Sequence, residues 1–350
     1  MKKISVLVVD DSSIYRQLLR DVLSKDSEIE VVSYAVNGRL ALPRVKHYKP
    51  NIIILDQEMP EMTGLEFLKV VKKDYPDIGV IMFSSHTQEG AKITISALEN
   101  GALDFVTKPE FSKDKDPEDY IKSKLIPKIK ELAYSKKIVP VKSRIASTSL
   151  SAKVARPGGY DVCAIGISTG GPSALRLLFG QLKRKLKGSI LIVQHMPPIF
   201  TRQLAESLDI VTELKVMESI DGLKIEPNTA YIAQGGFHLK VAVNVAQERV
   251  LRHSDEPPEV SCKPSVNVLF RSIANVYGGK SCGVIMTGMG NDGHEGMKVM
   301  NNHGSYLIAQ SEASCLVYGM PQKPTVENLV SESLSIEEIA QKIEFLLGVA

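Results

Sequence analysis

The sequence lacks a long apolar run of the kind that would place it in or across a membrane. Its apolar runs, such as 52–55 and 190–193, are far shorter than the ~20 residues that span a bilayer. The apolar run at the N-terminus, 4–9, ends at Asp10 before it reaches the length of a secretory signal core. We therefore expect no membrane insertion and a cytoplasmic location.

Closely spaced cysteines are also missing. The four cysteines, Cys163, Cys262, Cys282 and Cys315, stand far apart in the chain. None of the intervals has the short spacing that pairs of zinc ligands or a redox couple require. We expect four free thiols in a reducing compartment.

A strong charge of one sign is absent as well, since 43 basic and 40 acidic residues give a net charge of +3. The basic excess lies in residues 110–158, which carry 12 basic and six acidic groups, whereas the regions on either side are slightly acidic. A solvated interdomain segment is the simplest interpretation, and docking to acidic receptor or kinase surfaces is the alternative. We expect no nucleic-acid partner.

What the sequence does contain is a repeated alternation of strand-like and helix-like segments. A length of 350 residues predicts two domains, and short β-branched segments alternate with amphipathic ones over 1–109 and again from residue 160. This pattern predicts an α/β protein with two doubly wound parallel sheets. The predicted parts are a first domain, 1–137, with a core of 1–109 and a final helix, a flexible linker, 138–158, and a second domain, 159–350.

Individual elements follow from local composition. Strands are predicted at 4–9, 30–35, 52–55, 80–83, 104–106, 161–167, 189–194, 230–233, 283–287 and 306–309. An amphipathic helix is predicted at 117–137, although Pro127 interrupts its middle. A last helix begins after Ser335, which forms a capping-box pair with Glu338, and ends at Gly348.

Charged or polar residues follow several predicted strands of the first domain. Asp10 and Asp11 follow the first strand, Asp56 follows the third, Ser84 the fourth and Lys108 the fifth. The carboxyl ends of parallel strands gather at one edge of the sheet, so these side chains should meet there. Crowded carboxylates favour a hard divalent cation, Mg²⁺, which would bring a phosphoryl group to one of them, with Lys108 and Ser84 holding its oxygens.

These motifs resemble the two-component receiver domain, a flavodoxin-like fold. The resemblance rests on Val8-Val9-Asp10-Asp11-Ser12, Leu55-Asp56-Gln57-Glu58-Met59-Pro60 with Gly64, and Thr107-Lys108-Pro109. It implies that Asp56 accepts phosphate from a histidine kinase. It also implies that Asp10, Asp11 and the backbone carbonyl of Glu58 hold Mg²⁺ beside Asp56, and that Ser84 and Phe105 are the switch residues. Gln57 and Thr63 occupy variable positions of the motif, and we expect them to be harmless.

A serine between glycines follows the first predicted strand of the second domain. In the run Gly166-Ile-Ser168-Thr169-Gly170-Gly171-Pro172 the serine stands after a strand and before a helix, the context of a nucleophilic serine. A phosphate-binding loop is the competing interpretation, but a dinucleotide loop would need glycine at Ser168 and a Walker loop would need a following lysine. An ordinary tight turn also remains possible for this pattern alone.

A serine nucleophile needs a base and an acid. His195 is the best placed of the seven histidines, because it directly follows the strand 189–194, whereas His238 and His294 remain further loop candidates. Asp292 lies in a glycine-rich loop after the strand 283–287 and is the candidate acid, with a helix N-cap as its alternative role. The order Ser168, His195, Asp292 differs from that of α/β-hydrolases.

The second domain resembles the protein-glutamate methylesterase domain of bacterial chemotaxis, with a Rossmann-like sheet. The matching motifs are Gly166-Ile-Ser168-Thr-Gly-Gly, Gln194-His195-Met196-Pro197, Gly288-Met289-Gly-Asn-Asp292-Gly, Ala309-Gln310-Ser311-Glu312-Ala313-Ser314 and Tyr318-Gly319-Met320-Pro321. Asn267 and Ser311 stand where the family usually has Asp. These two departures concern the loop that contacts the substrate or the efficiency of the reaction, and not the type of reaction.

The resemblance implies a phosphorylation-activated esterase for chemotaxis adaptation. Ser168 would attack glutamate methyl esters on chemoreceptors and deamidate glutamines, with His195 as base, Asp292 as orienting acid and backbone N–H groups near Thr169 and Met289 holding the oxyanion. The receiver would cover the Ser168 site until Asp56 is phosphorylated. Rival hypotheses are a receiver with a non-enzymatic output, for which no helix-turn-helix signature follows the linker, and an esterase with another target.

Overall fold

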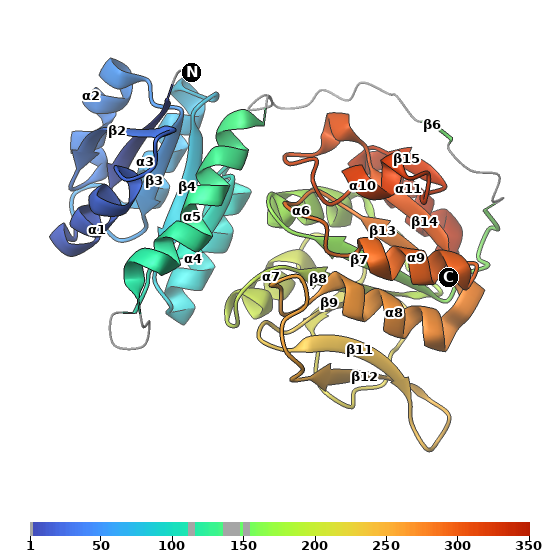
Figure 1. The fold of residues 1–350 in the computed structure, drawn as a ribbon. Helices are drawn as coiled ribbons and strands as arrows, with labels where there is room; N and C mark the ends of the chain where they lie inside the picture. The colour runs from blue at the N-terminus through green and yellow to red at the C-terminus, as the bar shows by residue number, and fades with distance from the viewer. Residues whose placement is uncertain (1–2, 111–115, 136–147, 150–154) are drawn as a thin grey trace. The chain divides into compact units, whose positions relative to one another are not determined.

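The computed structural model describes residues 3–110, 116–135, 148–149 and 155–350. The chain forms two compact units, Met1–Pro140 and Val141–Ala350 (Figure 1). Most of the predicted linker, 138–158, lies outside the described residues. Among the helices that the structure describes, none combines the length and the apolar composition needed to cross a bilayer.

The first unit alternates strands and helices along the chain. Its elements are β1 (Ile4–Val9), α1 (Ser13–Leu23), β2 (Ile29–Ala35), α2 (Gly38–Tyr48), β3 (Ile52–Asp56), α3 (Gly64–Asp74), β4 (Gly79–Ser84), α4 (Gln88–Glu99), β5 (Asp104–Thr107) and α5 (Pro117–Tyr134). The strands form a parallel sheet in the order β2-β1-β3-β4-β5, with Val9 beside Leu55. This order is that of a flavodoxin-like doubly wound sheet.

Both faces of this sheet are covered by helices. Helix α1 packs against α5, while α3 packs between α2 and α4. The central strands are therefore mostly apolar, and every residue of β3, including Asp56 at its end, is buried. Helix α5 includes Pro127, as expected, and its described part ends at Tyr134.

The second unit is larger and also alternates strands and helices. Its elements are β6 (Thr148–Ser149), β7 (Val162–Ile167), α6 (Gly171–Gln181), β8 (Ser189–Gln194), α7 (Phe200–Asp209), β9 (Lys215–Glu218), β10 (Thr229–Ile232), β11 (His238–Val243), β12 (Arg249–Ser254), α8 (Val266–Tyr277), β13 (Ser281–Ile285), α9 (His294–Asn302), β14 (Tyr306–Gln310), α10 (Gln322–Val326), β15 (Glu332–Leu334) and α11 (Ile336–Leu347). Short 3₁₀ turns lie at Gly278–Lys280 and Glu312–Ser314.

The strand order of the larger sheet is β6-β15-β14-β13-β7-β8-β10-β9, parallel except for the edge strand β6. The strands β8, β10 and β9 lie in that order on one side of β7. The later strands β13, β14 and β15 lie in order on its other side. The order thus reverses between β7 and β13. In doubly wound sheets ligands bind at the carboxyl edge next to such a reversal.

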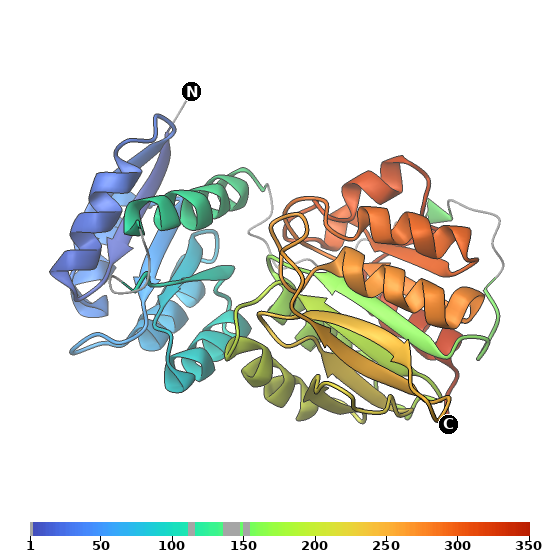
Figure 2. The ribbon, with the colours of Figure 1, turned by 60° about the horizontal axis from the view of Figure 1, so that its bottom comes forward.

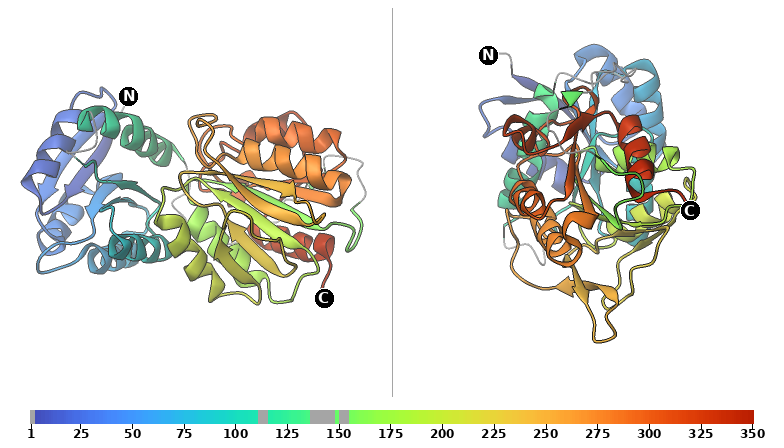
Figure 3. Two further views of the ribbon diagram at one scale, coloured as in Figure 1. Left: turned by 90° about the horizontal axis from the view of Figure 1, so that it is seen from below. Right: turned by 90° about the vertical axis from the view of Figure 1, so that its right-hand side faces the viewer.

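Helices again cover both faces of the second sheet. Figure 3 shows α8 and α9, in orange, on one face and α11, in red, on the other. The α8–α9 side encloses a core that includes Phe270, Met297 and Tyr231. The capping box predicted at the start of α11 is confirmed, because Ser335 and Glu338 bind each other's backbone N–H groups.

The antiparallel hairpin β11–β12 was not predicted from the sequence. The hairpin, drawn in gold in Figure 2, lies beside α8. Leu239, Val241 and Leu251 of the hairpin are buried, while Lys240 and Arg252, which lie opposite each other across the two strands, carry charge. The short strands β9 and β15 were also missed, because three or four residues give too little alternation to predict a strand.

Candidate functional site

Ser168 stands in the turn between β7 and α6, beside the reversal of strand order. Gly170 has a φ of 75°, the left-handed conformation that glycine adopts without steric cost. The Ser168 backbone is fixed from both sides: its N–H donates to the Thr287 carbonyl at 2.9 Å, and Gln194 Nε2 donates to its carbonyl at 3.0 Å. The turn thus holds the half-buried Ser168 side chain between the loops that follow β8 and β13.

The loops after β8 and β13 bring His195 and Asp292 together. His195 Nε2 lies 2.8 Å from Asp292 Oδ2, and the two side chains are 14% and 2% exposed. Burial disfavours the protonated imidazole, but the hydrogen bonds to Asp292 and to Cys262 outweigh it and raise the pKa of His195 to about 9. The pair is a charge-assisted hydrogen bond in a site largely closed to water.

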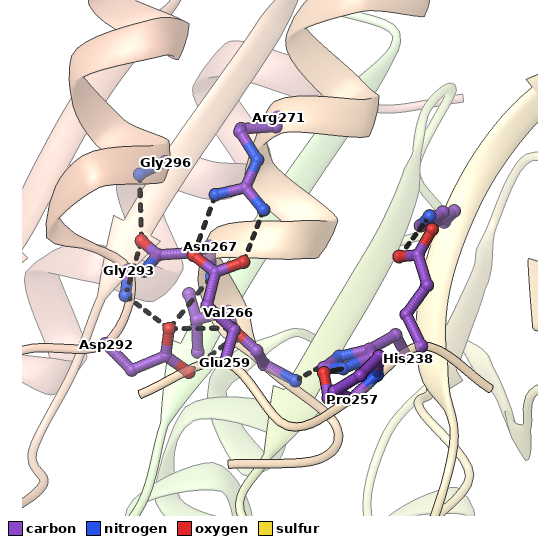
Figure 4. A network of polar contacts seen from close by, with 12 residues as sticks. His238, Pro257, Glu259, Val266, Asn267, Arg271, Asp292, Gly293 and Gly296 are labelled. Carbon is purple, nitrogen blue, oxygen red and sulfur yellow. Dashed lines mark hydrogen bonds and ion pairs between the residues drawn. The ribbon is translucent and has the colours of Figure 1, made fainter. Parts of the chain in front are cut away.

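Asp292 is held by the first turn of α8, which Figure 4 shows facing the carboxylate. Ser265 Oγ donates to Oδ1 at 2.8 Å, and the backbone N–H groups of Val266 and Asn267 donate at 2.7 and 3.1 Å. Burial raises the pKa of Asp292, but the bond to His195 and these N–H groups outweigh burial and lower it. A carboxylate at a helix N-terminus is stabilised in its charged form.

Asn267, one of the two departures from the family pattern, belongs to the support of this site. Its buried Oδ1 accepts from the N–H groups of Gly293 and Gly296, at 3.0 and 2.8 Å (Figure 4). The side chain thereby joins the first turn of α8 to the start of α9. Asparagine at this position supplies an acceptor without adding another negative charge beside Asp292.

The second ring nitrogen of His195 faces a cysteine. Nδ1 lies 3.7 Å from Cys262 Sγ. Within the described parts of the chain, Ser168 Oγ makes no hydrogen bond to the imidazole. Because Nε2 is bonded to Asp292, Nδ1 is the ring nitrogen that remains available to accept a proton. The structure therefore brings the three predicted residues to one place and completes the His195–Asp292 bond, with the Ser168–His195 bond unformed. Catalytic hydrogen bonds commonly close only when substrate binds.

Backbone donors are available next to Ser168. The N–H groups of Thr169 and Met289 make no hydrogen bond to any residue that the structure describes. The loop carrying Met289 passes close to Ser168, since a Cβ added at Gly288 would lie 2.7 Å from Ser168 Cβ. Two N–H groups without a partner among the described residues are free to donate to an oxyanion, and this role of Thr169 and Met289 stays a prediction.

In the first unit the predicted strand-end residues also converge. Lys108 Nζ lies 2.7 Å from Asp56 Oδ2 and 2.9 Å from Asp10 Oδ2. Oxygen atoms of Asp10, Asp11 and Asp56 all lie within 4.8 Å of one another. A set of hard oxygen donors fits Mg²⁺, and Glu58 follows Asp56 by two positions in an exposed loop.

The buried carboxylates of Asp10 and Asp56 repel each other. Burial, together with the negative charge of Asp10, raises the pKa of Asp56 to about 6, although Lys108 opposes the rise. Burial likewise raises the pKa of Asp10. For Lys108, burial lowers the pKa but the charges of Asp10 and Asp56 outweigh it and raise it. A bound cation would relieve the repulsion between the carboxylates.

The predicted switch residues are both buried, Ser84 fully and Phe105 with 7% of its surface exposed. Sequence reasoning missed that Gln57 contacts this switch. Gln57 is 2% exposed, and its Nε2 donates to Ser84 Oγ at 3.1 Å, to the Gly90 carbonyl at 2.8 Å and to Thr94 Oγ1. The residue after Asp56 therefore connects the phosphoacceptor loop to α4. Its place beside Asp56 was visible in the sequence, whereas its partners were not.

The remaining histidine candidates lie elsewhere. His238 is fully buried in β11, where Nε2 lies 3.0 Å from the Pro257 carbonyl and Nδ1 accepts the Ser265 N–H at 3.2 Å. His294 begins α9 and contacts Glu295 and Glu327. Neither contacts the His195–Asp292 pair, but His238 supports the residue that caps α8.

The chain matches known families over both units. Residues 163–343 match the family model described as CheB methylesterase, and residues 6–115 match the response regulator receiver domain. The chain belongs to the CheB methylesterase family. A protein-glutamate methylesterase/protein-glutamine glutaminase of Desulfotalea psychrophila is 39% identical to this chain over 365 residues, and the match covers 98% of each chain. A protein of the same name from Trichodesmium erythraeum is 39% identical over 354 residues, and the match covers 99% of this chain and 100% of the relative.

A solved structure of the family supports the fold of the second unit. The catalytic domain of the Thermotoga maritima CheB methylesterase is 34% identical to this chain and matches with a TM-score of 0.51. It covers 53% of this chain and 97% of its own length. The predicted α/β fold and the two family resemblances are thereby confirmed.

The raised pKa of Asp56 predicts a measurable effect of this carboxylate on the free energy of unfolding. Asp56 binds its proton more tightly in the folded protein than in the unfolded chain, so its contribution to folding is present below its ordinary pKa of 3.8 and is lost as pH rises through about 6. Asp56→Asn should therefore stabilise the first unit above pH 6 without divalent ions, by about 2 kcal/mol. Thermal unfolding in a chelator, from pH 4 to pH 8, measures the difference.

The control is Glu30→Gln, which removes an exposed carboxylate from the same unit. Its stability difference from the unsubstituted protein should stay small at every pH. A gain for Asp56→Asn that is equal at pH 4 and pH 8 would contradict the assignment.

Proposed function

We propose that this chain is a phosphorylation-controlled serine esterase, a protein-glutamate methylesterase and protein-glutamine glutaminase of chemotaxis adaptation. The observation that carries the proposal is the buried His195–Asp292 pair beside the Ser168 turn. Its support is the nearly full-length similarity to relatives that bear this enzyme name. The substrates are glutamate methyl esters and glutamine side chains of chemoreceptors.

In the first half-reaction Ser168 Oγ attacks the γ-carbonyl carbon of the substrate. Nδ1 of His195 takes the hydroxyl proton while Asp292 holds the Nε2–H and stabilises the imidazolium. The N–H groups of Thr169 and Met289 donate to the oxyanion of the tetrahedral intermediate. The carbon–oxygen bond to the methoxy group then breaks, and the proton on Nδ1 passes to it, releasing methanol.

In the second half-reaction water replaces the alcohol. Nδ1 accepts a proton from water, the hydroxide adds to the acyl carbon, and collapse of the intermediate returns the proton to Ser168 Oγ and frees a glutamate carboxylate. A glutamine substrate follows the same path with ammonia as the first leaving group. Both substrates thus yield glutamate on the receptor.

The first unit supplies the control. The Asp56 carboxylate attacks the phosphorus of a phosphohistidine on a histidine kinase, and the phosphorus–nitrogen bond breaks to leave an acyl phosphate. Lys108, 2.7 Å from Asp56, is placed to pair with a phosphoryl oxygen. Mg²⁺ held by Asp10, Asp11, Asp56 and the Glu58 carbonyl would neutralise the charge of the phosphoryl group. Ser84 and Phe105 would change their contacts in response.

Phosphorylation at Asp56 should raise the esterase activity, with the receiver restricting access to Ser168 until then. This division of labour assigns control to residues 1–137 and catalysis to 159–350, joined by the linker at 138–158. The partners are the kinase and the receptors, and we place the enzyme in the cytoplasm, without nucleic acid or membrane insertion.

The nucleophile is tested by Ser168→Ala. Removing the attacking hydroxyl should lower methanol release from methylated receptor membranes by at least about 10³-fold. Ser207→Ala, a half-buried hydroxyl on α7 of the same unit, is the matched control and should retain the activity. Undiminished release by Ser168→Ala would remove the nucleophile from the proposal.

The raised pKa of His195 predicts an alkaline pH profile. Only the neutral imidazole accepts the Ser168 proton, so kcat/KM should rise with pH. The profile should have its inflection near the His195 pKa of about 9 and level off above it. Cys262→Ala removes one of the two hydrogen bonds that raise this pKa and should move the inflection to lower pH. Cys315→Ala, which removes a buried thiol elsewhere in the same unit, should leave the inflection unchanged. The same inflection in all three proteins would be the contrary result.

Control by phosphorylation is tested by adding a small-molecule phosphodonor with Mg²⁺. Methyl-ester turnover should rise in the unsubstituted protein and stay at its basal rate in Asp56→Asn. Equal turnover with and without the donor, in protein shown by mass to be phosphorylated, would rule out the control.

A further inference from the structure

Cys262 occupies a place beside His195 that the esterase mechanism does not use. Its Sγ lies 3.7 Å from Nδ1, the nitrogen that must accept the Ser168 proton. Cys262 ends a tight turn closed by two backbone hydrogen bonds with Glu259, of 2.9 and 3.1 Å. The turn fixes the thiol at the site, and among the four cysteines this is the one that is not fully buried.

The separation of the two atoms matches a metal chelate. Zinc binds sulfur at about 2.3 Å and imidazole nitrogen at about 2.0–2.1 Å in tetrahedral geometry, so its sulfur and nitrogen ligands stand about 3.6 Å apart. The observed distance between Sγ and Nδ1 is 3.7 Å. One ion can therefore bridge the two atoms with little movement of either side chain.

The other side of the imidazole is arranged as in zinc sites. A histidine that binds a metal through one nitrogen usually donates its other N–H to a carboxylate, which orients the ring and strengthens its binding. Asp292 accepts from Nε2 at 2.8 Å and is itself held by the first turn of α8. The orienting group for catalysis thus also serves as the orienting group for a metal ion.

The surrounding charges permit a cation. Asp292 is negative and 2% exposed, and the neighbouring Lys263 directs its amine to Asp255, at 2.5 Å from Oδ1. Thiolate and imidazole favour ions of the zinc class over Mg²⁺. The oxygen donors of Asp10, Asp11 and Asp56 favour the opposite class, so each ligand set selects its own ion.

We infer that His195 Nδ1 and Cys262 Sγ form a binding site for a zinc-class divalent ion, which inhibits the esterase. The ion displaces the thiol proton and, where the imidazole is protonated, the proton on Nδ1; it then binds the two side chains and completes its coordination with water. With Nδ1 occupied, the imidazole has no nitrogen left to accept the Ser168 proton. Binding rests on the geometry alone, whereas inhibition rests also on the proposed function.

The test uses the full chain and two readouts. Co²⁺, a spectroscopic substitute for zinc, should give a thiolate-to-metal charge-transfer band, and Zn²⁺ should inhibit methyl-ester hydrolysis reversibly, with activity restored by a chelator. Cys262→Ser should abolish the band and raise the inhibitory Zn²⁺ concentration at least about 10-fold, relative to its own metal-free rate. Cys315→Ala should behave as the unsubstituted protein, and Mg²⁺ should not inhibit.

A ligand exchange separates loss of the site from loss of the fold. Cys262→His replaces thiolate by imidazole and should restore inhibition by Zn²⁺ without restoring the charge-transfer band. Equal inhibition of Cys262→Ser and the unsubstituted protein, or the absence of the band from the latter, would overturn the inference. A cobalt band at Cys262 in a protein without ester hydrolysis would instead refute the proposed function and leave the metal site standing.

Discussion

The buried carboxylate of Asp292 is the group on which the catalytic site depends. A charge that is 2% exposed is stable only if hydrogen bonds replace its water. Those bonds come from Ser265, Val266 and Asn267 at the start of α8 and from His195. The bonds that keep the carboxylate charged also hold it in the position from which it contacts the imidazole of His195.

A second constraint is shared by both units. Parallel sheets collect the residues that follow their strands at one edge, so short motifs separated in sequence meet in space. In the first unit this edge gathers carboxylates whose repulsion Lys108 only partly offsets. In the second it gathers a serine turn, an imidazole and a carboxylate. The same architecture thus places a cluster of carboxylates in one unit and a hydrogen-bonded His195–Asp292 pair in the other.

The state of His195 connects catalysis with the neighbouring thiol. Because Nε2 is bonded to Asp292, Nδ1 is the other ring nitrogen, and Cys262 lies 3.7 Å from it. The hydrogen bonds to Asp292 and to Cys262 together outweigh burial and raise the pKa of the imidazole. In the proposed mechanism the imidazole must lose its proton before Nδ1 can accept the proton of Ser168.

The sequence by itself determined the two parallel sheets, because β-branched runs and capping boxes are local signals, and the site motifs, because each directly follows a strand. It did not reveal the hairpin β11–β12 or the partners of Gln57. Only the tertiary structure decided that Ser265 and Val266 hold Asp292 and that Cys262 faces His195, 67 positions away. Such contacts join segments whose spacing carries no periodic signal, and they arise only when the helices and loops pack around the sheet.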